Sequence, residues 1–390
     1  MSKKCMRNTT SAAALTLFAV AMLPGGTGAA AQSGSSLAPQ VAVSAAGTDV
    51  GAPALSNTGR YIAYLSIRRG QTPPRQELRR ADLTGGGNEL LNPSIDGGVA
   101  SGNYSRPPII SADGKRVAFS TNATRLVQGD TNGRYDAFVR DASTDTTLLS
   151  SVAFDGDVAN GDTGMTSLSK NGRFAVFTSS ATDVVPGSTT TNADVYRRDL
   201  LNNTTVQVTV RPNGAPSTGP GSSAADVSAD GNLVAFNSYD TDLVPVDGAD
   251  QETDLFIRNM TTGKTRWLSA GFPVGMNPDG VVLSPNGQWV STRWADGSLN
   301  LTRVGTGVTS TVATDAYALH GSFSSTLGRF VFISGGAPYV RDLASGVNTA
   351  IVTPTGGVVS SVSISGNGQF AAYDFIPDDG SPSVIYRVAL

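Results

Sequence analysis

Oxygen-bearing side chains form the groups of residues in this sequence that could do chemistry. In the segment from Asp130 to Asp136, the side chains of Asp130, Asn132 and Asp136 stand at the first, third and seventh positions around Gly133. Carboxylate and amide oxygens around a turn-forming glycine are typical ligands of a hard cation such as Ca²⁺. A related segment later in the chain supplies four more carboxylates: Asp247, Asp250, Glu252 and Asp254.

A metal site is one of two interpretations of these segments. Their spacing departs from the full EF-hand loop, which ends in a bidentate glutamate. Aspartate and asparagine also cap tight turns by accepting hydrogen bonds from backbone N–H groups, which is the commoner role of such residues. We therefore expect either ordinary turns or a structural Ca²⁺ that stiffens the loops, and in neither case a catalytic metal.

Nucleophilic catalysis has little support in the sequence. His320 is the only histidine, so a Ser-His-Asp triad would have to use it, and a metal centre built from several histidines is impossible. The chain lacks a G-x-S-x-G segment, and we expect a structural or surface role for His320. Paired carboxylates could hydrolyse glycosides, but most candidates recur at equivalent repeat positions, which favours turn bracing: Asp113, Asp226, Asp230, Asp240 and Asp242.

A recurring phrase indicates which elements carry these side chains. It consists of a serine, two variable residues, a glycine and an apolar run that ends in an aromatic residue. An Asp-Gly or Asn-Gly pair favours a tight turn between antiparallel strands, and the alternating apolar residues after it favour a half-buried strand. Four copies are regular and three are weaker: Ser56–Tyr64, Ser111–Phe119, Ser169–Phe177 and Ser228–Phe236, then Ser284–Thr292, Ser325–Ile333 and Ser365–Tyr373.

The spacing of the phrases predicts the architecture. Their glycines, from Gly59 to Gly368 and including Gly328, lie roughly 40 to 60 residues apart, which leaves room for two further strands in each repeat. Four short strands per repeat make a propeller blade. Seven phrases therefore predict an all-β, seven-bladed propeller, with six blades as the alternative. We expect the strand around Val41 and Val43 to pair with the last strand, around Ile385, and so close the ring.

A later strand of the repeat is predicted at Asp136–Asp141, Asp194–Asp199 and Asp254–Asn259, where it ends in Arg-Asp or Arg-Asn. The phrase, this later strand and the repeat length together resemble the TolB-like family of WD-like propeller repeats. The resemblance covers residues 40–390 and is strongest in the first four copies. It implies a propeller fold. TolB itself has an additional N-terminal domain, and we expect no equivalent of it in the short segment before Gln40. The resemblance therefore does not imply TolB's own partners.

The first 31 residues have the pattern of a cleaved secretory signal. Lys3, Lys4 and Arg7 precede an apolar stretch, and small residues follow it. The stretch is too short to span a bilayer. Residues 32–39 then form a short flexible segment and residues 40–390 a single propeller domain. We therefore expect a secreted or periplasmic protein without integral membrane contact, and without disulfides because Cys5 lies within the signal.

Charge narrows the classes of partner. Removal of Lys3, Lys4 and Arg7 changes the formal net charge from −3 to −6, and no basic stripe remains for nucleic-acid binding. Propellers gather loops from every blade at one face. We expect a non-enzymatic module that binds a protein, peptide or glycan there. The alternative is a hydrolase or lyase that acts on polysaccharide with carboxylates at the channel.

Overall fold

The computed structural model describes residues 40–71, 75–188, 191–245, 252–272 and 275–390. These residues belong to one compact unit, which begins at Ser36. The predicted signal segment 1–31 and the predicted linker 32–39 lie outside the described residues. Within them, all regular structure is β-strand, and none of them forms a helix that could cross a membrane.

Seven antiparallel sheets follow one another along the chain, and each is one blade. The first two are β2 (Thr48–Leu55), β3 (Tyr61–Arg68), β4 (Gln76–Asp82) and β5 (Asn88–Leu90), then β6 (Ile109–Ile110), β7 (Arg116–Thr121), β8 (Asp136–Asp141) and β9 (Thr146–Leu149). The third and fourth are β10 (Thr163–Leu168), β11 (Phe174–Ser179), β12 (Asp194–Asp199) and β13 (Thr204–Gln207), then β14 (Ser222–Val227), β15 (Leu233–Ser238), β16 (Asp254–Asn259) and β17 (Lys264–Trp267).

The remaining blades are less regular. Blades 5 and 6 are β18 (Asp279–Leu283), β19 (Trp289–Arg293), β20 (Leu299–Arg303) and β21 (Thr309–Ala313), then β22 (Ala316–Tyr317), β23 (Arg329–Ser334), β24 (Ala337–Asp342) and β25 (Asn348–Ala350). Blade 7 joins both ends of the chain: β26 (Gly357–Val358), β27 (Val362–Ile364), β28 (Phe370–Pro377), β29 (Val384–Ala389) and β1 (Gln40–Val43).

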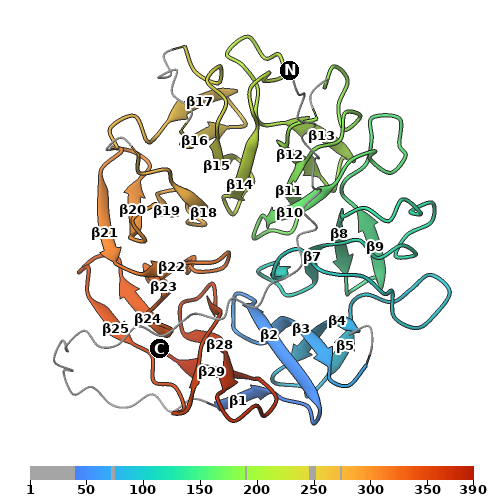
Figure 1. Ribbon diagram of the computed structural model, residues 1–390, viewed down its shortest axis with the longest axis vertical. Coiled ribbons are helices and arrows are strands. Elements are labelled where there is room, and N and C mark those ends of the chain that lie inside the picture. Colours follow the sequence, from blue (N-terminus) through green and yellow to red (C-terminus); the bar gives the residue numbers. More distant parts are fainter. Residues whose placement is uncertain (1–39, 72–74, 189–190, 246–251, 273–274) are drawn as a thin grey trace, which may run out of the picture. The chain divides into compact units, whose positions relative to one another are not determined.

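The blades stand side by side in a ring, as Figure 1 shows, with the first strand of each blade innermost. The ring closes as predicted. Strand β1 pairs antiparallel with β29, where Val41 lies opposite Tyr386 and Val43 opposite Ile385. Seven blades rather than six are therefore confirmed, and this pairing covers the outer edge of β29 that would otherwise lack a partner.

Aromatic pairs between second and third strands form much of the core. Phe119 stacks on Phe138, Phe177 on Tyr196, and Phe236 on Phe256, with ring centroids 5.6–5.7 Å apart. These residues are fully buried. They are the aromatic residues that end the phrase and the aromatic residues of the Arg-Asp strand, so the repeat places one large side chain of each strand in the same layer.

The phrase forms the turn between first and second strands. In blade 4 the hydroxyl of Ser228 accepts the N–H of Leu233 at 3.0 Å and donates to Asp230 at 2.6 Å. Gly231 has a φ of +82°, and a Cβ there would lie 2.0 Å from the ring of Phe174 in blade 3. The glycine is therefore required both for the turn and for the contact between blades.

The phrase of blade 6 differs from its predicted alignment. Ser324, not Ser325, accepts the N–H of the first strand residue, Arg329, at 2.9 Å. The turn position that is glycine elsewhere is consequently held by Leu327, which has a φ of +60°. The assignment of Gly328 as the phrase glycine is therefore wrong by one residue, because the serine pair at 324–325 leaves the register ambiguous in the sequence.

Backbone hydrogen bonds connect successive phrases around the ring. Asn57 donates to Ala112, Ala112 to Lys170, and Ala229 to Pro285, each at 2.8 Å. Asn171, Ser325 and Asn367 extend this belt across three further junctions by donating to Ala229, Gly366 and Asn57. Among the described residues, the belt is interrupted between blades 5 and 6, where Pro285, which has no N–H, stands at the position of Ala112 and Ala229.

Arginines reinforce most of the same junctions. Arg197 of blade 3 donates to the carbonyl of Gly231 in blade 4 at 2.5 Å and stacks over Phe174. Equivalent bonds to the next phrase come from four other arginines: Arg80 to Gly114, Arg116 to Gly172, Arg329 to Gly368 and Arg387 to Gly59. Among the described residues, the junctions from blade 4 to 5 and from blade 5 to 6 lack such a bond to the phrase.

The two faces of the ring differ in their connections. Tight turns, such as 111–115 and 142–145, join the first and third strands of each blade to the strands that follow them. Long connections, such as 122–135 and 150–162, lie at the opposite ends of the strands. We call these the turn face and the loop face. The belt of hydrogen bonds lies at the turn face.

Candidate functional site

The structure brings the first predicted metal-ligating group together at the loop face of blade 2. Asp136 opens β8 and is fully buried, and Asp130 is only 4% exposed. The side-chain amide of Asn132 donates to Asp136 at 3.2 Å, while its oxygen accepts the N–H of Arg134 at 2.7 Å. Asn132 thus forms a turn, as the alternative interpretation predicts, and also holds the Asp136 carboxylate in place.

Burial perturbs both carboxylates of this group. It raises the pKa of Asp136 to about 6, a shift that hydrogen bonds from Ser151 and Asn132 oppose and the charge of Asp130 increases. Burial also raises the pKa of Asp130. Two neighbouring carboxylates that both resist ionisation mark a place where negative charge is poorly compensated.

The second predicted group is only partly described. Asp247 and Asp250 lie outside the described residues. Asp254 opens β16 and accepts hydrogen bonds from the hydroxyl of Ser269 at 2.6 Å and the indole of Trp267 at 2.7 Å. The same brace recurs in blades 2 and 3, where Ser151 donates to Asp136 and Thr209 donates to Asp194.

A different polar cluster lies inside the ring near the turn face. Lys170 of blade 3, Asp226 of blade 4 and His320 of blade 6 line one small cavity. Lys170 and Asp226 occupy inner positions of the repeat at which the other blades have uncharged residues. The counterparts of Lys170 are Asn57, Ala112, Ala229, Pro285, Ser325 and Gly366, and those of Asp226 are Ala54, Ile109, Ser167, Val282, Ser322 and Ser363. Together with His320, three departures from the repeat therefore lie around one cavity.

Asp226 is the centre of this cluster. It is 2% exposed and accepts hydrogen bonds from the hydroxyl of Ser167 in blade 3 and from the N–H of Leu283 in blade 5, the latter at 2.8 Å. His320 Nδ1 lies 3.1 Å from Asp226 Oδ1, but the two atoms are not aligned for a hydrogen bond, and neither ring nitrogen has a hydrogen-bond partner within the described part of the chain. One carboxylate thus links four consecutive blades.

The cavity beside Asp226 is very small. Its volume is about 10 Å³, close to what one water molecule requires. Burial lowers the pKa of Lys170, and the charge of Asp226 opposes that shift. The space accommodates a water that bridges polar side chains, whereas a sugar ring or a peptide does not fit.

The cluster lacks the geometry of a catalytic triad. Activation of a serine requires its hydroxyl to donate to the histidine, which the carboxylate orients from the other side. Here Ser167 donates to the carboxylate itself. Sequence reasoning set His320 aside and did not consider Lys170. Alignment of the seven repeats position by position would have singled out both, because each is a charged or titratable exception on the inner surface.

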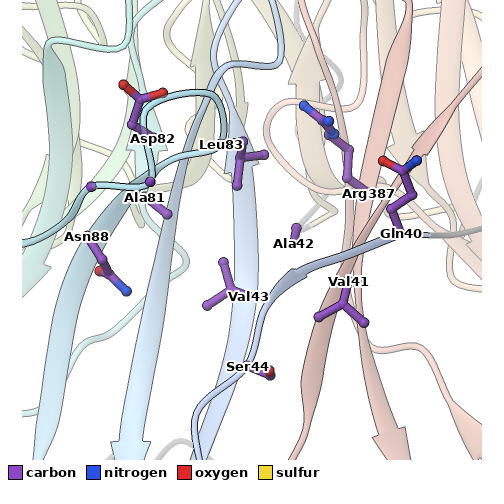
Figure 2. A pocket seen from close by; sticks show the side chains of 12 residues that line it. Gln40, Val41, Ala42, Val43, Ser44, Ala81, Asp82, Leu83, Asn88 and Arg387 are labelled. Atoms are coloured by element: carbon purple, nitrogen blue, oxygen red, sulfur yellow. The ribbon is translucent and has the colours of Figure 1, made fainter.

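A larger cavity lies at the closure of the ring, with a volume of about 490 Å³. Figure 2 shows Gln40 and Arg387 on one side of this groove and Asp82 and Asn88 on the other. Its charged groups have partners within the fold. Arg387 donates to the carbonyl of Gly59, and Asp82 is paired with Arg60 at 2.7 Å. The groove is therefore the space between blades 7 and 1.

No three histidine, cysteine, aspartate or glutamate side chains among the described residues stand close enough together to hold a metal ion by themselves. A cation in the segment 130–136 would thus need backbone or water oxygens beside the carboxylates.

Comparisons with solved structures agree with this architecture. The chain is similar to an oligogalacturonate lyase solved in complex with manganese, at 11% identity, with 88% of this chain and 90% of that one covered and a TM-score of 0.57. At the level of fold, the chain is a seven-bladed β-propeller. A TolB-like protein from Agrobacterium tumefaciens, described as a putative TolB, also matches, at 15% identity, with 87% and 90% covered and a TM-score of 0.41.

Similarity at this level shows a shared fold alone. No family model matches the sequence of this propeller, and no curated protein matches it.

Proposed function

We propose that this propeller is an exported, non-enzymatic module that binds a polypeptide partner through its loop face. The observation that carries the proposal is the contrast between the faces. Tight turns and a hydrogen-bonded belt occupy one face, while the long connections of blades 1 to 4 gather at the other. Long loops on a rigid scaffold are the usual place for recognition.

The loop face also carries the exposed side chains that a partner would contact. Phe154 is 61% exposed, Ile95 57% and Tyr239 44%. Aromatic side chains are enriched in protein interfaces. Phe154 is followed by the exposed acidic residues Asp155 and Asp157. A partner segment that combines basic and apolar residues would complement this surface.

The enzymatic alternative has less support in the geometry. A glycosidase needs two accessible carboxylates that face each other across the substrate. The neighbouring carboxylates with raised pKa, Asp130 and Asp136, are buried within a loop. Asp226 lies in a space the size of one water.

A phage-displayed library of random peptides, selected on immobilised protein, tests the proposal. We expect enrichment of basic peptides with an apolar residue. Their affinity should fall at least about tenfold in a variant that combines Phe154→Ala with Asp155→Lys and Asp157→Lys. The matched control is Leu201→Ala, since Leu201 is 69% exposed on the turn face. Equal losses in both variants, or selective binding on a glycan array without any peptide, would contradict the proposal.

Export has a separate test. We propose cleavage before Gln32, as the small residues at 29–31 suggest. Expression of the full chain in a bacterial host, followed by N-terminal sequencing of the protein outside the cytoplasm, should find Gln32 first. Retention of Met1 in the cytoplasm would contradict it.

A further inference from the structure

The Asp130 carboxylate has one oxygen that no described part of the fold satisfies. The residue is 4% exposed, and its Oδ1 is buried without a hydrogen-bond partner. A buried carboxylate oxygen without a donor or cation is costly, so such an atom indicates a missing partner. The backbone N–H of Asn132 donates to this carboxylate, but Oδ1 still lacks a partner among the described residues.

Blade 3 shows how the same place is normally satisfied. Ser188 stands where Asp130 stands in blade 2, and its hydroxyl lies 3.3 Å from the hydroxyl of Tyr196. In blade 2 the residue that corresponds to Tyr196 is Phe138, which carries no hydroxyl. The exchange of a serine for an aspartate, together with the loss of the tyrosine hydroxyl, thus leaves a negative charge where blade 3 has a neutral pair.

The surroundings supply no basic side chain for this charge. Among the described residues, neither Asp130 nor Asp136 forms an ion pair with a lysine or arginine. The nearby Arg134 is directed to Asp162, 3.6 Å away. Asp162 also accepts the N–H of Tyr135 at 3.1 Å, which ties the segment 130–136 to the connection before β10.

We propose that a divalent cation of the size of Ca²⁺ binds between Asp130 and Asp136. Asp130 Oδ1 is the principal ligand and Asp136 the second. Asn132 orients Asp136 and is not itself a ligand through its side chain, because its oxygen accepts the N–H of Arg134. Backbone oxygens and water complete the shell, as hard cations accept neutral oxygen ligands readily. The cation compensates the charge of the two buried carboxylates and so stabilises the segment 130–136.

Thermal unfolding with and without Ca²⁺ tests this site. In the wild type, Ca²⁺ at a hundredfold excess over its Kd should raise Tm by about 3 °C or more relative to the chelator EDTA. Asp130→Ser copies the residue of blade 3 and should abolish the shift while the variant stays folded. Asp155→Ser, an exposed acidic residue in the neighbouring connection, is the matched control and should retain it.

Isothermal titration calorimetry with CaCl₂ separates binding from folding. We expect one site in the wild type, none in Asp130→Ser, and at least about tenfold weaker binding in Asp136→Asn. Absence of both heat and a Tm shift in the wild type would overturn the proposal. A shift that persists in Asp130→Ser would place the cation elsewhere and overturn it as well. The test is independent of the peptide partner proposed above.

Discussion

Blades 2 to 4 and blades 5 and 6 have the same sheet topology but differ in how they are joined. Between blades 2 and 4, each junction has a belt hydrogen bond and an arginine that donates to the next phrase. Between blades 5 and 6, the described residues show neither. Pro285 removes the donor, and Leu327 occupies the turn with a positive φ. The ring is therefore uneven, with a weak junction beside its polar cluster.

This difference teaches that the repeat encodes junctions as much as strands. The four regular phrases are those of blades 1 to 4, and in the first three of these blades an arginine donates to the phrase glycine of the next blade: Arg80 to Gly114, Arg116 to Gly172 and Arg197 to Gly231. The loss of contacts is local to the phrase of blade 5: the described residues show no arginine bond on either side of it and no belt bond to blade 6, whereas the weak phrases of blades 6 and 7 keep both kinds of bond between blades 6 and 7 and between blades 7 and 1. His320 lies at the irregular start of blade 6, where its Nδ1 is 3.1 Å from Asp226 Oδ1 of blade 4.

The strongest test of the comparison is Gly231→Ala in the regular part. The alanine would have to keep a backbone φ of +82°, and its methyl group would lie 2.0 Å from the Phe174 ring. Strain and overpacking together should lower the free energy of unfolding by about 3 kcal/mol or more, as measured by urea denaturation. Gly156→Ala is the control for backbone strain alone, because its φ is positive and a Cβ there would meet no heavy atom within 4 Å. Equal losses would show that packing at the junction is unimportant.

The pH dependence of stability is the second test. The third strand begins with an aspartate in blades 2 to 4 but not in blades 5 and 6, so titration of this aspartate affects only the regular part of the ring. The folded-state pKa of Asp136 is raised from 3.8 to about 6. A raised carboxyl pKa means that the folded state favours the protonated form, so this contribution to stability is present below pH 4 and is lost as pH rises through 6. Its size is about 3 kcal/mol.

Chemical denaturation in EDTA between pH 4 and pH 7 measures the contribution of Asp136 protonation to the free energy of unfolding. The Asp136→Asn variant cannot ionise at this position and should show a correspondingly smaller loss of stability as pH rises. Identical pH profiles for the wild type and the variant would contradict the assignment. Ca²⁺ should reduce the wild-type loss, because a bound cation favours the ionised carboxylate.

The sequence predicted the fold in detail where local signals repeat. The strands Asp136–Asp141, Asp194–Asp199 and Asp254–Asn259 begin and end where the Arg-Asp pattern placed them. The closure by Val41 and Val43 followed from an unmatched strand at each end. The error at Gly328 arose because two adjacent serines allow two registers, and only the hydrogen bond from Arg329 to Ser324 distinguishes them.

The candidate sites were less predictable, for physical reasons. The proximity of Asp130, Asn132 and Asp136 follows from their closeness in the chain, so spacing sufficed. The cluster of Lys170, Asp226 and His320 combines three blades, and its members are up to 150 residues apart in sequence. Its formation depends on how inner strands face the axis, which becomes visible only when the repeats are aligned in register.

Removal of one junction arginine should have an intermediate effect. Arg197→Met loses the hydrogen bond to Gly231 and the contact over Phe174, whose centroid lies 4.5 Å from the guanidinium. We expect a loss of about 2 kcal/mol in the free energy of unfolding. Arg303→Met is the matched control, because Arg303 stacks over Trp289 at 5.1 Å without bonding to the next phrase. A loss in Arg303→Met as large as in Arg197→Met would show that stacking, and not the junction bond, matters.

Repair of the weak junction should have the smallest effect and is the most direct test of its cause. Leu327→Gly relieves a left-handed backbone conformation at a residue that is 59% exposed. It also increases the conformational freedom of the unfolded chain, so the net gain in the free energy of unfolding should be at most about 1 kcal/mol.

Pro285→Ala restores an N–H at the one place where the described belt is interrupted. Hydrogen exchange is the decisive measurement, because it reports local opening separately from global unfolding. If the missing donor causes the weakness, the new amide at 285 becomes protected and the amides of β22 and β23 exchange more slowly, whereas those of β11 and β12 in the regular part do not change. If the amide at 285 exchanges freely, blade 6 is held away from blade 5 by its own irregular start, and the lost hydrogen bond is a consequence of that geometry.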